Sequence, residues 1–229
     1  MQQKRVGVVL AGCGYLDGAE ITEAVLTLYF LERAGLESRC FAPDRPQMHV
    51  VNHLTGEPTG EARNILVESA RIARGKVEPL DRARMEELDA LVLPGGFGVA
   101  KNLSDFAARG PEADVDTELV RLVGEALSRG KPLVGICISP AILAAVLHKL
   151  GIGGARLTIG DDAGTAAAVT ALGARHEVCP VDRAIVDERL RIVSTPAYML
   201  GPGPRDVGAG IEQAIATLAG WLRGATGPV

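Results

Sequence analysis

One cysteine of this chain stands where its position alone could make it a nucleophile. Cys137 follows the apolar run Leu133–Ile136, and Pro140 behind it suits the first turn of a helix. A residue at such a strand-to-helix turn is pushed into a strained backbone conformation and projects beyond the end of the sheet. The helix N-terminus would also lower the pKa of the thiol. The segment predicts a nucleophile, although a buried, inert cysteine would fit it too.

Two other segments could supply the groups that a cysteine nucleophile needs. The glycines of Pro94–Gly98 let backbone N–H groups approach a ligand closely, so the N–H groups of Gly96 and Ile138 could form an oxyanion hole. The alternative for this segment is an ordinary tight turn. Glu20 and Glu23 share one face near the start of a predicted helix. We interpret Glu20 as an acid that stabilises the helix start, and the residues alone leave the role of Glu23 open.

The alternation of strands and helices is expected to bring these segments together. Short apolar runs predict buried strands, and the longer amphipathic stretches between them predict helices. We expect strands at Arg5–Ala11, Ser38–Ala42, Asp89–Leu93 and Leu133–Ile136, and helices at Ala19–Ala34, Val115–Ser128 and Pro140–Leu150. This order is typical of βαβ units and predicts one α/β domain, a doubly wound, mainly parallel sheet with helices on both faces. Ligands of such sheets bind beyond the carboxyl ends of the strands.

Several segments are less regular. We expect a helix at Glu61–Arg74, irregular strands or a hairpin at Val178–Thr195, and a final amphipathic helix at Ile211–Arg223. His49, His53 and Glu57 have the spacing of metal ligands on a helix, but Pro46 and Gly56 argue against a helix there. A loop or lid over the pocket, shaped in part by Asn52 and His53, is the expectation.

Two further patterns were weighed. The stripe Val25, Leu28 and Leu31 has helical spacing and is expected in the core, whereas Cys13 follows the first strand and could face the same pocket as Cys137. The glycines of Gly12–Gly18 depart by one residue from the dinucleotide fingerprint, which leaves nucleotide binding as a minor alternative.

Composition excludes several classes of protein. The 229 residues carry a net charge of −4 with no basic cluster, which argues against nucleic-acid binding. No apolar run reaches the roughly 18 residues that span a bilayer. The four cysteines form no CxxC pair, and the apolar stretch near the start is too short for a signal peptide. We therefore expect a soluble, cytoplasmic protein with reduced thiols.

Two sets of segments carry a family resemblance. The first resembles the PfpI branch of the class I glutamine amidotransferase-like superfamily, at Gly18–Glu23, Leu93–Gly96, Ala100–Ser104 and Gly135–Pro140. The second spans nearly the whole chain and is similar to the ElbB family, also called isoprenoid biosynthesis glyoxalase or enhancing lycopene biosynthesis protein, at Cys40–Asp44, Val51–Glu57, Ser69–Gly75, Cys179–Asp182 and Thr195–Leu200.

The resemblance implies a fold, an assembly and an activity. It implies one flavodoxin-like domain over residues 1–229 with a family-specific insertion at about 45–80, a homodimer, and conversion of glyoxal to glycolate without a cofactor or metal. Its site residues would be Cys137 as nucleophile, Glu23 as proton partner, and the backbone donors of Gly96 and Ile138. Hydrolytic members of the superfamily place a histidine beyond the nucleophile helix, whereas Leu157–Asp162 contains none here. We therefore do not expect amide hydrolysis.

Aldehyde chemistry needs fewer groups. The expected substrate is a small reactive carbonyl compound: the Cys137 thiolate would form a hemithioacetal, and Glu23 would move a proton through an enediol to give a thioester that water releases as glycolate. Two alternatives remain open, namely a redox-sensing or regulatory binding protein that uses Cys137 without catalysis, and a hydrolase of activated acyl compounds.

Overall fold

A parallel sheet forms the centre of the computed structural model, which describes residues 3–201 and 203–224. Its seven strands are ordered β3-β2-β1-β4-β5-β9-β8, and only β8 runs antiparallel to its neighbour. The strands are β1 Arg5–Val9, β2 Glu37–Ala42, β3 Val77–Pro79, β4 Ala90–Leu93, β5 Leu133–Ile136, β8 Ile185–Asp187 and β9 Ile192–Thr195; β6 Arg156–Leu157 and β7 Arg175–His176 form a separate pair.

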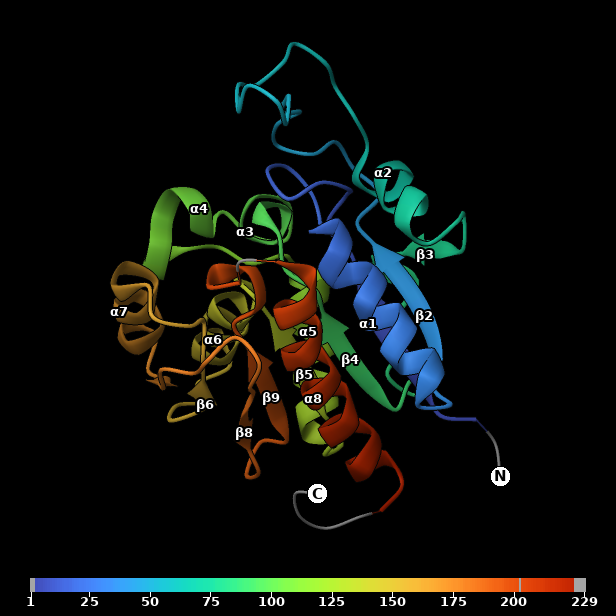
Figure 1. Ribbon diagram of the computed structural model, residues 1–229, viewed down its shortest axis with the longest axis vertical. Coiled ribbons are helices and arrows are strands. Elements are labelled where there is room, and N and C mark those ends of the chain that lie inside the picture. The colour runs from blue at the N-terminus through green and yellow to red at the C-terminus, as the bar shows by residue number, and fades with distance from the viewer. Residues whose placement is uncertain (1–2, 202, 225–229) are drawn as a thin grey trace.

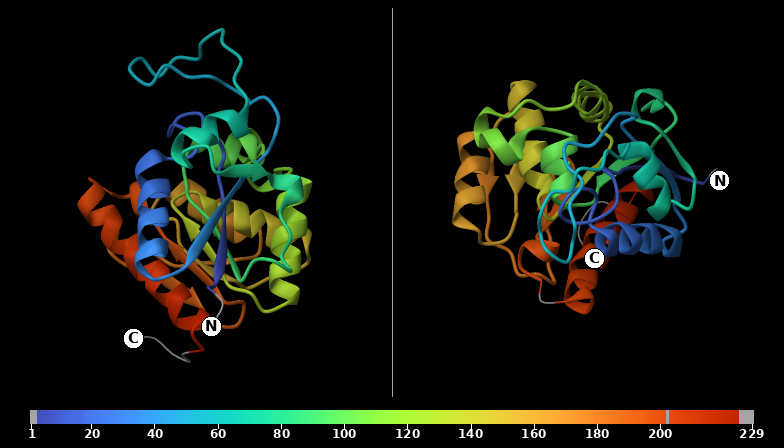
Figure 2. Two further views of the ribbon diagram at one scale, coloured as in Figure 1. Left: turned by 90° about the vertical axis from the view of Figure 1, so that its right-hand side faces the viewer. Right: turned by 90° about the horizontal axis from the view of Figure 1, so that it is seen from above.

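Helices cover both faces of this sheet. They are α1 Ile21–Arg33, α2 Ile65–Ile72, α3 Phe97–Asn102, α4 Phe106–Arg109, α5 Thr117–Ser128, α6 Ser139–Lys149, α7 Ala163–Ala171 and α8 Pro204–Leu222, with 3-10 turns at Leu80–Arg82, Gly110–Glu112 and Ala197–Met199. Helices α1 and α8 lie on one face and α5 and α6 on the other (Figures 1 and 2). The predicted doubly wound, mainly parallel fold is confirmed.

The central strands are buried on both faces, and that burial explains their continuous apolar sequence. In β4, Leu91 and Leu93 pack into the core under α5 and α6, whereas Ala90 and Val92 pack into the core under α1 and α8. Successive side chains of a strand point to opposite faces, so both sets must be apolar when helices cover both.

Some predicted elements differ from the observed ones. Strand β3 was not predicted, because its three residues at the sheet edge are too short to show a period. Helix α8 begins at Pro204 rather than Ile211, since Pro204 fits a first helical turn. Val25 is 48% exposed, not in the core, because α1 packs through Ala24, Phe30 and Leu31. The predicted hairpin is confirmed as β8 and β9.

Residues 45–64, here called the arm, project from the body of the molecule. The arm follows β2 and extends beyond the carboxyl end of the sheet (Figure 1). Leu54 at its tip is 97% exposed. Asp17 holds its base, because a carboxylate oxygen of this buried residue accepts a hydrogen bond of 2.7 Å from the Val51 N–H. Among the described residues, no helix is both long and apolar enough to cross a membrane.

Candidate active site

Cys137 occupies the turn between β5 and α6. Its φ of 64° lies in the left-handed region that residues with a Cβ rarely adopt, so the predicted strained conformation is present. Two hydrogen bonds hold the turn: the Cys137 N–H donates to the Thr195 carbonyl over 2.9 Å, and the Ser139 hydroxyl donates to the Pro94 carbonyl over 2.7 Å. The side chain is thereby fixed at the carboxyl end of the sheet.

Glu23 lies directly behind this cysteine. It is fully buried in the first turn of α1, and its carboxyl group forms a hydrogen bond with the Cys137 thiol. Its two oxygens also accept backbone bonds, from the Gly95 N–H over 2.9 Å and from the Tyr198 N–H over 3.1 Å. Glu20 caps the same helix by accepting from the Glu23 N–H over 2.6 Å, as interpreted from the sequence.

The glycines after β4 allow the close approach. A Cβ on Gly95 would lie 2.3 Å from the Cys137 Cβ and 2.5 Å from a Glu23 carboxyl oxygen. Gly96, with φ of 100°, donates its N–H to the cysteine sulfur, as does Ile138. The structure therefore brings Cys137, Glu23, Gly96 and Ile138 together, and it directs the two predicted backbone donors at the sulfur itself.

A methyl group at position 95 should disrupt this arrangement. We expect Gly95→Ala to lower activity by about 10²-fold, because the added Cβ must displace the Cys137 or Glu23 side chain. The overlap should also lower the free energy of unfolding by about 1–3 kcal/mol. Denaturant unfolding and the glyoxal assay described below measure both effects.

Gly60→Ala is the matched control, because a Cβ there meets no atom within 4 Å. It should leave the free energy of unfolding within about 0.5 kcal/mol of wild type. Full activity in Gly95→Ala would show that the contact of Cys137 with Glu23 is not needed.

Burial and mutual repulsion control the charges of the pair. Burial raises the pKa of Glu23 to about 8, and the nearby Glu20 charge adds to the rise. Burial and the Glu23 charge hold the pKa of Cys137 well above its ordinary value, outweighing the Gly96 and Ile138 N–H groups. The expected acidic thiol is therefore wrong. Deprotonation of the pair begins at Glu23, whose carboxylate then faces a thiol.

A pocket opens in front of Cys137. Its volume is about 610 Å³, and its walls combine aromatic, other apolar and acidic side chains with the cysteine: Tyr15, Phe97, Tyr198, Ile138, Met199, Glu20, Asp162, Thr165, Gly96 and Cys137. Sequence reasoning did not name Tyr15, Phe97, Asp162, Thr165, Tyr198 or Met199 as pocket residues. Tyr198 and Met199 lie within the quoted segment Thr195–Leu200, which was the available signal for them.

Other sequence candidates lie elsewhere. Neither Asn52 nor His53 lines the pocket, so the arm is not the expected lid; His53 instead accepts from the Leu16 N–H over 3.3 Å and packs edge-on against Tyr15. Cys13 is also absent from the pocket walls, and its neighbours include Glu68, Arg71 and Asp17. Within the described ranges, no group of three or more His, Cys, Asp and Glu side chains is arranged to hold a metal.

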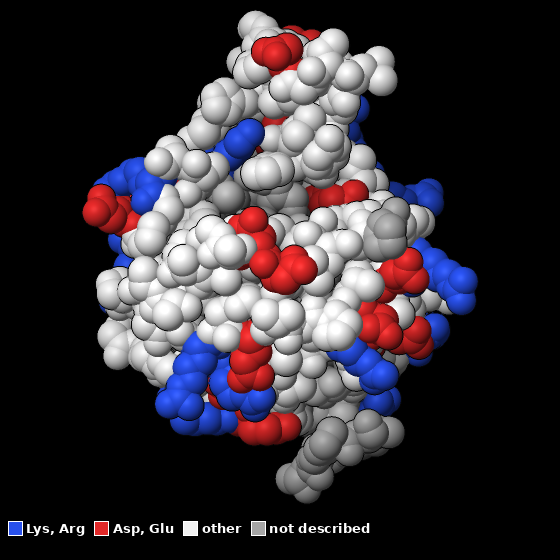
Figure 3. All heavy atoms as spheres, turned by 60° about the vertical axis from the view of Figure 1, so that its left-hand side comes forward, with Lys and Arg blue, Asp and Glu red and all other residues white. Residues whose placement is uncertain are grey.

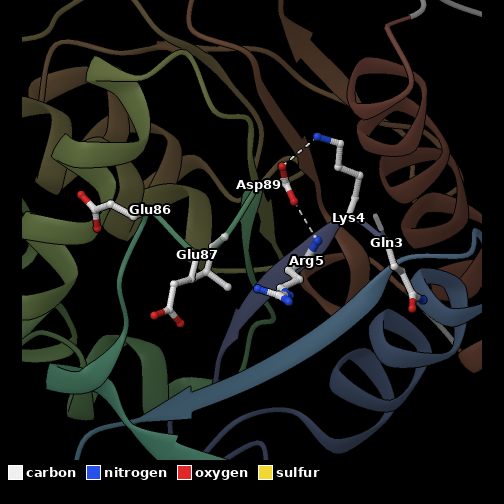
Figure 4. Close-up of a pocket in the computed structure, with 7 residues that line it drawn as sticks. Gln3, Lys4, Arg5, Glu86, Glu87 and Asp89 are labelled. Carbon is white, nitrogen blue, oxygen red and sulfur yellow. Dashed lines mark hydrogen bonds and ion pairs between the residues drawn. The ribbon is translucent and has the colours of Figure 1, made fainter. Parts of the chain in front are cut away.

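A second hollow, of about 160 Å³, lies at the opposite edge of the sheet (Figure 4). Its central acid, Asp89, accepts hydrogen bonds from the Lys4 ammonium over 3.0 Å and from the Arg5 backbone N–H over 2.9 Å. Its charges are thus paired with one another, and its walls contain no cysteine. The pocket at Cys137 is the stronger candidate.

Comparisons with known proteins give close relatives. The chain matches no protein-family model. It is 47% identical to the human "Glutamine amidotransferase-like class 1 domain-containing protein 3, mitochondrial" over 205 residues, 85% of this chain and 75% of that one. It is 32% identical to "ES1 protein, mitochondrial" of Danio rerio, over 85% of this chain and 76% of that one. These names point to mitochondria, so the predicted cytoplasmic location is wrong.

Solved structures agree with the fold. An isoprenoid biosynthesis protein with an amidotransferase-like domain from Ehrlichia chaffeensis superimposes with a TM-score of 0.88 at 40% identity, covering 95% of this chain and 99% of that one. A DJ-1 superfamily protein from Salmonella typhimurium gives a TM-score of 0.58 at 23% identity, covering 97% and 92%, which shows the fold alone.

Proposed function

Because the chain belongs to the family of glutamine amidotransferase-like class 1 domain proteins that includes the ES1 proteins, we propose that it is an enzyme whose nucleophile is Cys137. We propose further that it converts glyoxal to glycolate without a cofactor. The observation that carries this proposal is the contact of one sulfur with a buried carboxyl group and two backbone N–H groups beside the pocket.

The first step is attack of the sulfur on one carbonyl carbon of glyoxal. The Glu23 carboxylate takes the thiol proton as the carbon–sulfur bond forms, and this proton passes to the carbonyl oxygen. The N–H groups of Gly96 and Ile138 already donate to the sulfur, so they lie beside the oxygen that gains negative charge on the neighbouring carbon. A hemithioacetal results.

The second step is an internal redox change. The carbon bonded to sulfur is one bond from the atom that Glu23 contacts, so the regenerated carboxylate is placed to remove its proton. Return of this proton to the second carbon, through an enediol, oxidises the first carbon to a thioester and reduces the second to an alcohol. Water then cleaves the thioester, which frees glycolate and the thiol, so the overall reaction adds one water to glyoxal.

The alternatives fit this site less well. A sensor that responds by oxidation needs a stable thiolate, whereas burial and Glu23 raise the pKa of Cys137. Amide hydrolysis needs a base that can also protonate an amine, and no histidine is among the pocket residues that the structure describes. The homodimer implied by the family resemblance stays a prediction.

Incubation of the purified protein with glyoxal tests the proposal. We expect glycolate to accumulate in proportion to protein concentration when glutathione and added metal are absent. Heat-denatured protein supplies the control for uncatalysed rearrangement. Production of glycolate at the control rate would refute the proposed activity.

A further inference from the structure

The pocket is far larger than glyoxal requires. Its volume of about 610 Å³ falls within the range of roughly 300–1,000 Å³ that is typical of sites for drug-sized ligands. Glyoxal is a two-carbon molecule and would leave most of this space filled with water. The unused space lies among side chains that are specific enough in type to indicate what it accepts.

Two aromatic rings stand at the pocket without being buried in the core. Tyr15 is 49% exposed and Phe97 is 50% exposed. Their backbones are tied together, because the Phe97 N–H donates to the Tyr15 carbonyl over 2.7 Å. Contact with His53 at a ring distance of 5.3 Å further orients Tyr15. With Tyr198 they offer a fixed aromatic surface against which an apolar group could be buried.

The charged residues of the pocket walls are both acidic. Glu20 and Asp162 each use one carboxylate oxygen to cap a helix, the first for Glu23 N–H and the second for Thr165 N–H. No lysine, arginine or histidine is among the wall residues within the described part of the chain. Nearby, Lys101 donates to the Leu16 carbonyl and lies 5.6 Å from the Phe97 ring, outside the walls. The pocket therefore disfavours an anion.

The charge distribution of the surface agrees with this. On the face shown in Figure 3, acidic side chains occupy the middle, whereas most lysine and arginine side chains lie along the lower edge and the sides. No basic cluster there leads an anionic substrate inward.

We infer that the physiological substrate is a 2-oxoaldehyde whose second carbon carries a bulky, uncharged apolar group, and that the pocket repels the anionic product. This inference rests on the proposed function. The aldehyde carbon would bond to Cys137, and the apolar group would lie against Tyr15, Phe97 and Tyr198. The reaction adds water, oxidises the aldehyde carbon to a carboxylate and reduces the ketone carbon to an alcohol. A neutral substrate thus becomes an anion that Glu20 and Asp162 disfavour.

Matched substrates test the inference by turnover. Phenylglyoxal should show a kcat/KM at least about tenfold above that of glyoxal, because its ring is buried on binding. 4-Carboxyphenylglyoxal should fall about fivefold or more below phenylglyoxal because of repulsion by the acids. Asp162→Asn should narrow this second ratio, since Asn keeps the helix cap and removes one charge. Phe97→Ala should narrow the first ratio.

A binding measurement separates failure of the inference from failure of the proposed function. Titration followed by NMR compares neutral 1-phenylethane-1,2-diol with anionic mandelate, which carries the same ring. We expect the diol to bind at least about fivefold more tightly. Equal binding, or tighter binding of mandelate, overturns the inference whether or not glyoxal is turned over. Turnover of glyoxal with no preference for phenylglyoxal also overturns it and leaves the proposed function intact.

Discussion

Replacement of Cys137 by serine should reduce glycolate formation from glyoxal by at least about 10³-fold. Serine is nearly isosteric, so the turn between β5 and α6 and its backbone contacts should persist. Its hydroxyl is a far weaker nucleophile than sulfur and holds its proton more tightly. A loss of this size corresponds to about 4 kcal/mol of transition-state stabilisation. Initial rates at saturating glyoxal measure the effect.

Cys179→Ser is the matched control for this substitution. Cys179 is also buried, and burial raises its pKa to about 11, but it does not line the pocket. This variant should keep the wild-type rate. A Cys137→Ser protein that folds normally and still forms glycolate at a wild-type rate would remove Cys137 from the reaction.

Replacement of Glu23 by glutamine should both slow the reaction and move its pH dependence. Wild-type activity should rise as the pH passes through about 8, because the pKa of Glu23 is raised to about 8 and its carboxylate is the base. Glutamine cannot accept the proton, so we expect a fall of about 10²–10⁴-fold at pH 8. The residual activity should rise only at higher pH, because deprotonation then falls to the thiol, whose pKa burial still holds up. Rates measured from pH 6 to pH 10 test both effects.

Glu20→Gln is the control for charge alone. The Glu20 charge contributes to the raised pKa of Glu23, so its removal should shift the rise in activity to lower pH. Opposite shifts in Glu20→Gln and Glu23→Gln would distinguish the base from its neighbour. An unchanged profile in Glu23→Gln would contradict the proposed role of Glu23.

The local sequence was sufficient to predict the elements that hold Cys137. The run Leu133–Ile136 and the following Pro140 are adjacent in the chain, and their pattern specifies a strand, a turn and a helix. Gly96 and Glu23 could be placed near the cysteine because both follow strands of a parallel sheet. Edge strand β3 has too few residues to carry a pattern.

Long-range contacts explain what the sequence did not predict. The pKa of Cys137 depends on complete burial against Glu23, which comes from a distant helix and outweighs the local effect of the helix N-terminus. The Tyr198 N–H that binds Glu23 lies 175 residues away in the chain. The arm was expected to cover the pocket, but Asp17 and the Leu16 N–H fix it beside the rim.

Mass spectrometry of the protein during turnover tests the central claim most directly. The reaction is quenched in acid after mixing with glyoxal, and the modified residue is located by peptide mapping. We predict an adduct of one glyoxal on Cys137 that forms rapidly, is lost in step with glycolate release, and is absent in Cys137→Ser. Release of glycolate by wild type with Cys137 unmodified throughout, or an adduct on Cys137 that persists without releasing glycolate, would contradict the account.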